Sequence, residues 1–222
     1  MKKRNKSKIR RSRRINPIEI FVDVPKGRSG DWRIERYAVS ERDALMFNIR
    51  NECRYASDRN IKPGTYTRLM CRYTVVMSDT PAEKRDHIEF IKRAKGQILI
   101  NGLGLGYAIE VCCRKGTVEH ITVIEKSPDV IKLSGPHYLK RYPDKLTIIQ
   151  ADAFTWEPPK GMRYDAVWHD IWNNHCSDNL VEMDQLEKKS QGIADWQGSW
   201  GRARCEMLSF IESRRYGVWM LN

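Results

Sequence analysis

A short apolar stretch that runs directly into a glycine-rich turn constrains the fold of this chain more than any other feature. Residues 97–100 read Gln-Ile-Leu-Ile, and residues 101–106 carry a glycine at every second position. The apolar run predicts a central strand of a parallel sheet, covered on both faces. Glycines have no Cβ atom, so the turn can adopt positive φ and let a ligand approach the backbone. With a helix predicted over residues 107–114, this order of elements predicts a site for a nucleotide-like ligand.

Three further apolar runs each end in polar residues. Residues 120–125 end at Glu125, residues 146–150 lead to Asp152, and residues 164–168 lead to His169 and Asp170. The carboxyl ends of parallel strands meet at one edge of an open α/β sheet, and ligands bind there, at the crevice where the strand order reverses. Glu125 follows Gly102 by 23 residues, a spacing that suits a contact with ribose hydroxyls. Ser127 and Pro128 predict the start of a helix that runs to about Arg141.

The glycine spacing separates the nucleotide-type ligands. A dinucleotide fingerprint requires Gly or Ala five residues after its first glycine, where this chain has Tyr107. A triphosphate-binding loop requires Gly-Lys followed by Ser or Thr, and the sequence has no such tripeptide. The pattern therefore favours an adenosyl cofactor.

Taken together, these segments resemble the motif series of class I S-adenosylmethionine-dependent methyltransferases. The resemblance covers residues 97–172 and is carried by Gly102 to Gly106, Glu125, Asp152 with Ala153, and the strand that ends at Asp170. Residues 75–80, followed by Glu83, Asp86, His87 and Glu89, are similar to the hairpin and first helix that precede the core in the spermidine synthase branch. The resemblance implies a Rossmann-like doubly wound sheet and S-adenosyl-L-methionine as the cofactor.

The resemblance also implies roles for individual residues. The glycine turn would lie against the methionine moiety and ribose, Glu125 would take the ribose hydroxyls, and Asp152 with Ala153 would meet the adenine amino edge. The cofactor-binding residues would be Asn101, Gly102, Leu103, Gly104, Gly106, Glu125, Lys126, Asp152, Ala153 and Asp170. Asp170 and His169 are the candidates for positioning the acceptor or acting as a general base. Trp172, Asn173 and Tyr73 are the candidates for acceptor binding.

Two departures leave the acceptor open. Aminopropyltransferases of the spermidine synthase branch carry an Asp at the position of Leu105, and a second acidic cluster with Pro where this chain has His169 to Trp172. Amino-directed DNA methyltransferases carry Pro-Pro and an aromatic residue after the fourth strand, and this chain does not. We therefore expect a methyltransferase that acts on nucleic acid or a small nucleophile. An aminopropyltransferase-like enzyme and an inactive cofactor-binding accessory protein are the alternatives.

Most of the net charge of +12 lies at the amino terminus. Nine of the first 14 residues are Lys or Arg and none is acidic, so the remainder carries about +3. Residues 1–16 are predicted to form a disordered basic tail. Such a tail can bind nucleic acid electrostatically, or serve only as a solubilising terminus.

The rest of the chain divides into two predicted parts. Residues 17–90 are expected to form a small α+β lobe, with alternating runs such as residues 18–22, a polar helix near residues 40–55 and a turn at Pro63-Gly64. Residues 91–222 are expected to form the cofactor-binding domain, with helices at residues 179–191 and 201–215. Only residues 216–222 remain for closing strands, so one strand and a shortened sheet are predicted. Trp196 and Trp200 are read as bracketing an aromatic loop.

Composition narrows the setting. No run of about 20 apolar residues occurs, so no membrane span is predicted. The six cysteines form no CxxC pair, which is typical of reduced thiols in a cytoplasmic protein. His169, His175 and Cys176 lack the spacing of a zinc site, so no metal is expected. The sequence leaves the oligomeric state open.

Overall fold

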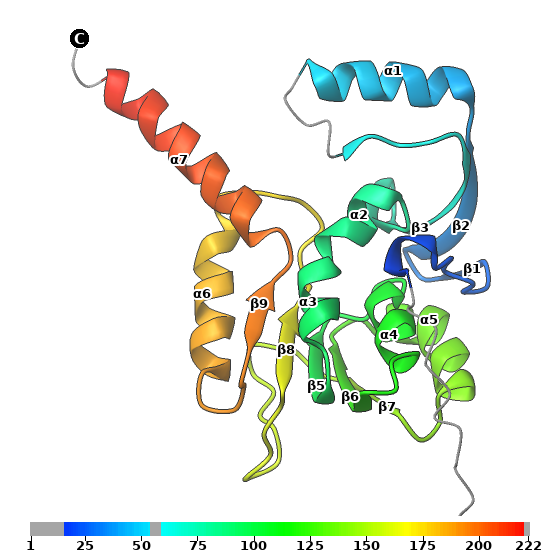
Figure 1. Cartoon of the computed structure of the whole chain (residues 1–222), viewed down its shortest axis with the longest axis vertical. Coiled ribbons are helices and arrows are strands. Elements are labelled where there is room, and N and C mark those ends of the chain that lie inside the picture. Colours follow the sequence, from blue (N-terminus) through cyan, green and yellow to red (C-terminus); the bar gives the residue numbers. More distant parts are fainter. Residues whose placement is uncertain (1–15, 54–58, 220–222) are drawn as a thin grey trace, which may run out of the picture.

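A five-stranded parallel sheet organises the carboxyl-terminal half of the chain (Figure 1). The computed structural model describes residues 16–53 and 59–219, with side chains to residue 214. The strands are β5 (Gly96–Asn101), β6 (Val118–Glu125), β7 (Leu146–Gln150), β8 (Ala166–His169) and β9 (Gln197–Ser199). Their order is β7-β6-β5-β8-β9, and every pairing is parallel. The chain thus builds outward from β5 to β7 and then returns to the other side of β5. This is the predicted Rossmann-like, doubly wound α/β fold.

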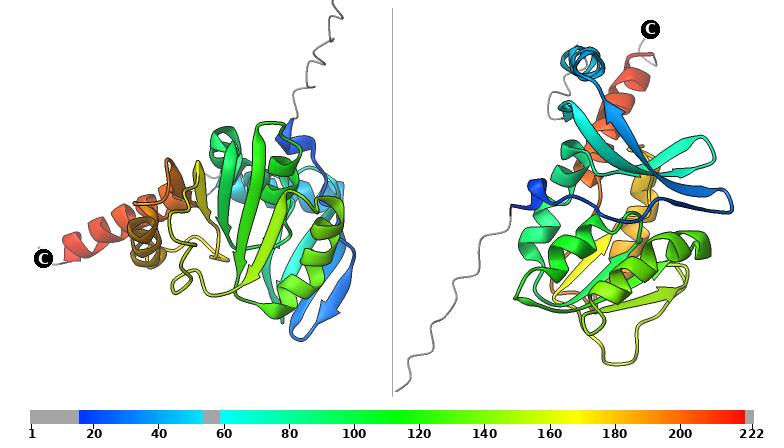
Figure 2. Two further views of the ribbon diagram at one scale, coloured as in Figure 1. Left: turned by 90° about the horizontal axis from the view of Figure 1, so that it is seen from below. Right: turned by 90° about the vertical axis from the view of Figure 1, so that its right-hand side faces the viewer.

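Helices cover both faces of this sheet (Figure 2). On one face, α3 (Ile88–Arg93), α4 (Tyr107–Cys113) and α5 (Pro128–Arg141) pack in one apolar cluster with Ile98 and Ile100 of β5. On the other face, α6 (Asn179–Ser190) packs Leu186 against the cluster that contains Leu99. The alternation along β5 therefore sends neighbouring side chains into opposite layers, and Ile98, Leu99 and Ile100 are all buried. The prediction of a central strand covered on both faces is confirmed.

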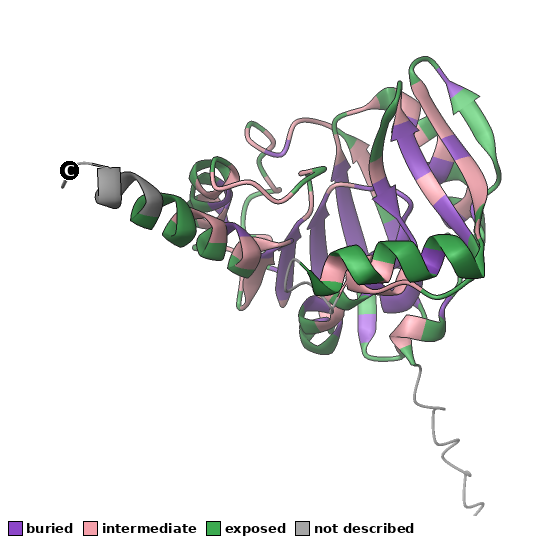
Figure 3. Ribbon diagram, turned by 90° about the horizontal axis from the view of Figure 1, so that it is seen from above, coloured by how far each residue is buried: buried purple, intermediate pink, exposed green. Residues whose placement is uncertain are grey.

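A second, antiparallel sheet is built from the amino-terminal residues. Its strands β1 (Gly27–Ser29), β2 (Trp32–Val39), β3 (Gly64–Cys71) and β4 (Thr74–Ser78) lie in the order β1-β2-β3-β4. The sheet is accompanied by the short helix η1 (Pro17–Glu19), by α1 (Glu41–Glu52) and by α2 (Pro81–Asp86). Packing of α5 against β1 and β2 joins the two sheets. The predicted polar helix is confirmed as α1, which begins at its N-cap Ser40 and is largely exposed (Figure 3).

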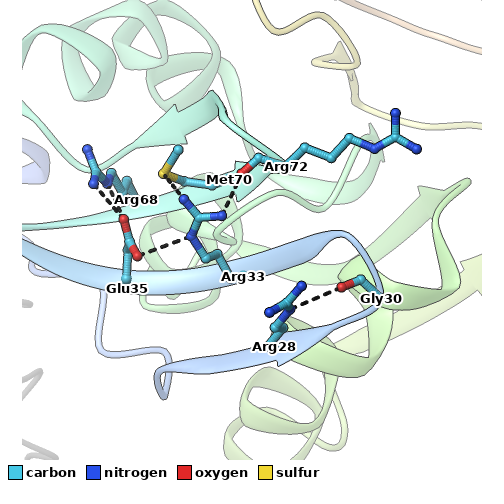
Figure 4. A network of polar contacts seen from close by, with 7 residues as sticks. All are labelled: Arg28, Gly30, Arg33, Glu35, Arg68, Met70 and Arg72. Atoms are coloured by element: carbon cyan, nitrogen blue, oxygen red, sulfur yellow. Dashed lines mark hydrogen bonds and ion pairs between the residues drawn. The ribbon is translucent and has the colours of Figure 1, made fainter.

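The two faces of this second sheet differ in character. Its outer face carries a polar network in which Glu35 binds both Arg33, at 3.2 Å, and Arg68, at 2.6 Å (Figure 4). Arg33 also donates to the carbonyl oxygen of Arg72 at 2.5 Å. The alternate residues of β2 and β3 include Ile34 and Leu69, which are paired in register and buried in the main core. One face of the sheet thus faces solvent and the other faces the parallel sheet.

Two predictions about the ends of the chain need correction. The alternating sequence that begins at residues 18–22 is matched by alternating burial, with Ile20, Val22 and Val24 buried. The segment nevertheless forms no strand. Val22 instead bonds to side chains: its N–H donates to Asp79 Oδ2 and its carbonyl accepts from Thr67 Oγ1. Side-chain partners replace the strand ladder, so the pattern of burial survives without a sheet.

The carboxyl terminus also differs from the prediction. The helix α7 (Arg202–Trp219) continues through residues that were expected to form a closing strand. The fifth strand is β9, within the segment predicted as an aromatic loop. It spans three residues, too few for any periodicity to be visible in the sequence. The sheet is short, as predicted, but its last strand lies between α6 and α7.

Residues 1–15 of the predicted tail lie outside the described residues, and Asn16 is its one described residue. None of the helices in the described part of the chain is long and apolar enough to cross a membrane.

Candidate functional site

A cavity of about 300 Å³ lies at the carboxyl edge of the parallel sheet, beneath the antiparallel sheet. We call its lining residues from the tips of β5 to β9 the floor: Gly102, Gly104, Glu125, Lys126, Ala151, Asp152, Ala153, Asp170, Ile171, Trp172 and Trp200. We call those from β2, β3, β4 and α2 the roof: Trp32, Leu69, Val76, Met77 and Glu83. The remaining lining residues are Ile124, Val130, Phe154 and Glu182. The cavity is within the range of sizes typical of small-molecule sites.

The glycine turn is held in place by close contacts with the protein itself. A Cβ atom at Gly102, where φ is 105°, would lie 2.0 Å from the carbonyl oxygen of Asp170. A Cβ atom at Gly106, where φ is 74°, would lie 2.1 Å from the ring of Tyr138. The hydroxyl of Tyr138 also donates to the carbonyl of Leu105 at 2.7 Å. Glycine is therefore required here by the packing of β8 and α5 against the turn, and Gly102 and Gly104 line the cavity while Gly106 does not.

Glu125 joins the glycine turn to the start of α5. Its Oε2 accepts a hydrogen bond from the N–H of Leu103 at 2.8 Å, and its Oε1 accepts one from the N–H of Ser127 at 2.8 Å. Each oxygen of a carboxylate can accept a second bond. The side chain is thus oriented by the backbone and still able to accept from a bound hydroxyl. Leu103 is itself buried and contributes through its backbone.

Asp152, at the tip of β7, is held by two donors. Lys126 Nζ lies 2.8 Å from its Oδ2, and the N–H of Phe154 donates to its Oδ1 at 2.9 Å. The bond from Lys126, followed by the bond from Phe154, lowers the pKa of Asp152. Lys126 is largely exposed, with 78% of its side chain accessible. An ionised carboxylate therefore lies at this end of the floor.

The opposite end of the cavity holds carboxylates whose charge is disfavoured. Burial, and then the nearby Glu83, Asp86 and Glu125, raise the pKa of Asp170 well above its ordinary value. Burial raises the pKa of Glu83 to about 7, although the positive charge of Arg59 opposes the shift. Acidic groups that lie this close disfavour one another's ionised form.

A fully buried histidine lies behind Asp170. Nε2 of His87 is 3.9 Å from Oδ2 of Asp170, and the side chain of His87 is 0% exposed. Neither of its ring nitrogens has a hydrogen-bond partner within the part of the chain that the structure describes. Burial lowers the pKa of His87 to about 4, so the ring is neutral at pH 7. In the sequence, Glu83 and His87 stand out only through the family resemblance, although their spacing of four is typical of side chains on one face of a helix.

His169 and Asn101 form a buried pair apart from the cavity. Nδ2 of Asn101 lies 2.8 Å from Nδ1 of His169, and neither residue lines the cavity. Burial lowers the pKa of His169 to about 4. The pair thus links β5 and β8 inside the sheet. Of the two candidates for catalysis, the structure brings Asp170 to the cavity and places His169 away from it.

The three candidates for acceptor binding are placed differently. Trp172 lines the cavity, and its Nε1 donates to Glu182 Oε2 at 2.7 Å. Asn173 is exposed and does not line the cavity. Tyr73 is 95% exposed at the turn between β3 and β4 and does not line the cavity. The antiparallel sheet contributes Trp32, Leu69, Val76 and Met77 instead. The sequence did not predict these four as site residues, because the docking of this sheet over the cavity is not visible in the sequence.

The cavity lining is strongly acidic although the chain is basic. It includes the carboxylates of Glu83, Glu125, Asp152, Asp170 and Glu182. Lys126 is the single cation among the lining residues within the described ranges, and it pairs with Asp152. Such a lining disfavours a polyphosphate ligand and suits a ligand that carries positive charge, hydroxyls and amino groups. In residues 16–53 and 59–219 no group of three or more His, Cys, Asp or Glu side chains is arranged to hold a metal ion.

Comparisons with known proteins give partial structural likeness and no sequence relative. No family model matches the chain, and no curated protein matches it. Among solved structures, it is similar to an S-adenosylmethionine-dependent methyltransferase from Clostridium acetobutylicum, with 12% identity and a TM-score of 0.36 over 50% of this chain and 43% of that one. It is also similar to the N-methyltransferase NodS from Bradyrhizobium japonicum, with 14% identity and a TM-score of 0.40 over 50% of this chain and 62% of the other.

A third similar structure is the CcbJ methyltransferase from Streptomyces caelestis, with 13% identity and a TM-score of 0.39 over 50% of this chain and 47% of that one. The chain thus spans between 43% and 62% of the length of these three proteins. With TM-scores of 0.36 to 0.40, the structural likeness to each of the three proteins is partial.

Proposed function

We propose that this chain is an S-adenosylmethionine-dependent methyltransferase that acts on a small nucleophile. One observation carries the proposal. Glu125, Asp152 and Asp170, from the tips of three strands, line one cavity beside the glycine turn at the reversal of strand order. Nucleotide-type ligands of open α/β sheets bind at this place.

The residues present fit the chemical groups of the cofactor. Glu125 has acceptor capacity left on both oxygens and would take the ribose hydroxyls. Asp152 would accept from the adenine amino group, beside Ala153 and Phe154. Asp170, next to Gly102, would face the ammonium group of the methionine moiety. The excess of carboxylates in the lining favours a sulfonium cation over phosphate-bearing nucleotides.

The cofactor would supply an electrophilic methyl group, and this chain would supply alignment. The glycine turn and Glu125 are fixed by backbone hydrogen bonds, so the floor is oriented before a ligand arrives. The roof closes the cavity over the reacting groups and excludes water from them.

Three roof residues, Val76, Met77 and Glu83, belong to the hairpin and helix that are similar to the spermidine synthase branch. Transfer of an aminopropyl group is the second candidate. The structure argues against it at Leu105, which is fully buried and directs its N–H to Sδ of Met77 at 3.3 Å. No carboxylate stands at this position, where aminopropyltransferases carry Asp. An inactive cofactor-binding protein remains the third reading, and product formation separates it from the first.

Calorimetric titration with S-adenosylmethionine and with its demethylated product tests the proposal. We expect micromolar binding that Glu125→Gln and Asp152→Asn each weaken about tenfold or more, equivalent to about 1.4 kcal/mol. Glu119→Gln is the matched control, because Glu119 is exposed near the opposite end of the same strand. Absence of binding by a folded wild-type sample would overturn the cofactor assignment. If the wild type binds the cofactor, transfer of a labelled methyl group to an acceptor would exclude the inactive reading.

A further inference from the structure

Beside Asp170 lie two side chains, Glu83 and His87, that the cofactor contacts proposed above leave unused. We call Glu83, Asp170 and His87 the acidic corner. Glu83 and Asp170 line the cavity, and His87 lies 3.9 Å from Asp170. If Asp170 faces the methionine ammonium, Glu83 is left facing the space between floor and roof.

Among the described residues, the main positive charge that acts on Glu83 is that of Arg59, and Arg59 is already paired with an acidic side chain. Lys126 pairs with Asp152 at the other end of the floor, and Arg59 pairs with Asp86 at 2.5 Å. The groups that act on Glu83 are Arg59, Asp86 and Asp79, together with the backbone of Ser78. Two of these three side chains are acidic, so a positively charged ligand would be favoured beside Glu83.

His87 provides a second, independent observation. A histidine with 0% exposure and no hydrogen-bond partner for either ring nitrogen, among the described residues, is rare. Its ring lies against Tyr107 and Trp168, with centroids 5.4 and 6.0 Å away, so it cannot turn toward solvent. Its Nε2 lies 3.9 Å from Oδ2 of Asp170. Small movements of Asp170 on ligand binding would give this ring its missing partner.

Apolar and aromatic side chains line the same cavity. Trp32, Leu69 and Met77 line the roof, and Trp200 lines the floor. Trp32 and Trp200 come from segments outside the proposed adenosyl contacts. Aromatic side chains of this kind bind planar, apolar ligands by stacking and edge contacts.

We propose that the methyl acceptor is a small aromatic molecule with a protonated amino group, which the acidic corner binds while Trp32 and Trp200 contact its ring. The proposal rests on the proposed function and names its substrate class. Glu83 is assigned as the residue that recognises the amine and takes its proton, and His87 as a residue that positions Asp170.

An alkylammonium has a pKa near ~10.4 and must lose a proton before its nitrogen can attack. The carboxylate of Glu83 accepts that proton. The nitrogen lone pair forms a bond to the methyl carbon, the bond between that carbon and the sulfonium sulfur breaks, and its electron pair stays on sulfur. The product is a methylated ammonium, and Glu83 returns its proton to solvent after release. A pKa of about 7 allows Glu83 to do both near neutral pH.

Binding of tryptamine to the full chain, saturated with the demethylated cofactor, tests the inference. Indole-3-propionate serves as the anionic counterpart of similar size. We expect tryptamine to bind at least tenfold more tightly than indole-3-propionate, and Glu83→Gln to remove that preference. Glu89→Gln is the control, because Glu89 is exposed and does not line the cavity. Trp32→Ala is expected to weaken tryptamine at least fivefold.

The readouts separate this inference from the proposed function. Retained affinity of the Glu83→Gln variant for the demethylated cofactor, within about twofold, shows that the fold and the floor are intact. Equal or tighter binding of the anionic probe, or unchanged tryptamine binding by Glu83→Gln, overturns the amine inference and leaves the methyltransferase proposal standing. Loss of cofactor binding by the wild type overturns both.

A rate measurement tests the role of His87. With labelled cofactor and tryptamine, His87→Gln is expected to lower kcat at least tenfold with a change in KM below threefold, because it acts through Asp170. A purely structural role predicts loss of folded protein with unchanged kcat per folded molecule, and that result would overturn the positioning role.

Discussion

The floor and the roof of the cavity are built in different ways. The floor residues follow five parallel strands, and backbone hydrogen bonds fix Glu125 and Asp152 in place. The roof residues come from a hairpin sheet and the short helix α2, and they meet the floor only through tertiary packing. In the proposed function, the floor would hold the cofactor and the roof would select the second substrate.

The largest expected effect concerns the packing of the glycine turn on which the floor depends. Gly106→Ala places a methyl group 2.1 Å from the Tyr138 ring at a φ of 74°. Left-handed strain of about 1–2 kcal/mol and overpacking of about 1–3 kcal/mol should together destabilise the protein by about 2–5 kcal/mol. Urea unfolding measures this loss.

Gly161→Ala is the matched control, since Gly161 has a φ of 82° and no atom within 4 Å of its added Cβ. It should cost only the strain, about 1–2 kcal/mol. Equal losses in the two variants would show that Tyr138 does not constrain the turn.

The next effect distinguishes the two residues at the tip of β8. His169→Ala leaves the amide of Asn101 without its partner inside the sheet, which should cost about 2–3 kcal/mol of stability. Cofactor affinity should change less than about twofold, equivalent to about 0.4 kcal/mol. His120→Ala is the control, because His120 bonds to Thr147 at an exposed position. Loss of methyl transfer by His169→Ala at full stability would instead make His169 catalytic.

A third effect concerns the roof and depends on pH. The folded pKa of Glu83, about 7, lies above its ordinary value of 4.5, so the folded state prefers the protonated form. The associated stability is fully present below pH 4.5 and is lost as the pH rises through about 7. Between pH 5 and 8 wild type should lose about 2 kcal/mol more than Glu83→Gln.

Unfolding curves of both proteins at the two pH values provide the comparison. The comparison uses the difference between wild type and variant because His87 and His169, whose pKa values are lowered, change the stability with pH in the opposite direction to Glu83. Their neutral folded forms make the protein more stable as the pH rises from about 4 through their ordinary value of 6.5. Parallel pH dependence of the two proteins would show that Glu83 is not buried as described.

The smallest effect is expected on the outer face of the roof sheet. Glu35→Gln removes the ion pairs with Arg33 and Arg68, whose side chains are about one-third exposed (Figure 4). Surface pairs of this kind contribute about 0.5 kcal/mol, and high salt should reduce that further. Thermal unfolding and cofactor titration should both remain near wild type. A tenfold loss of cofactor affinity would mean that the outer face influences the cavity.

The sequence determined the parallel sheet, its order of elements and the tips of four of its strands. These features are local: an apolar run, a glycine turn and a capped helix each lie within a few residues of chain, and their physical causes act over that range. Ser127 is the N-cap of α5, as its type and position predict: its side chain accepts a hydrogen bond from the N–H of Val130.

Only the tertiary structure decided which side chains meet. It placed Glu83 and His87 beside Asp170, moved Tyr73 to an exposed turn, and built the last strand from Gln197 to Ser199. A hairpin residue looks the same in sequence whether it faces solvent or a cavity, because alternation fixes its face and the docking of the two sheets fixes what that face covers.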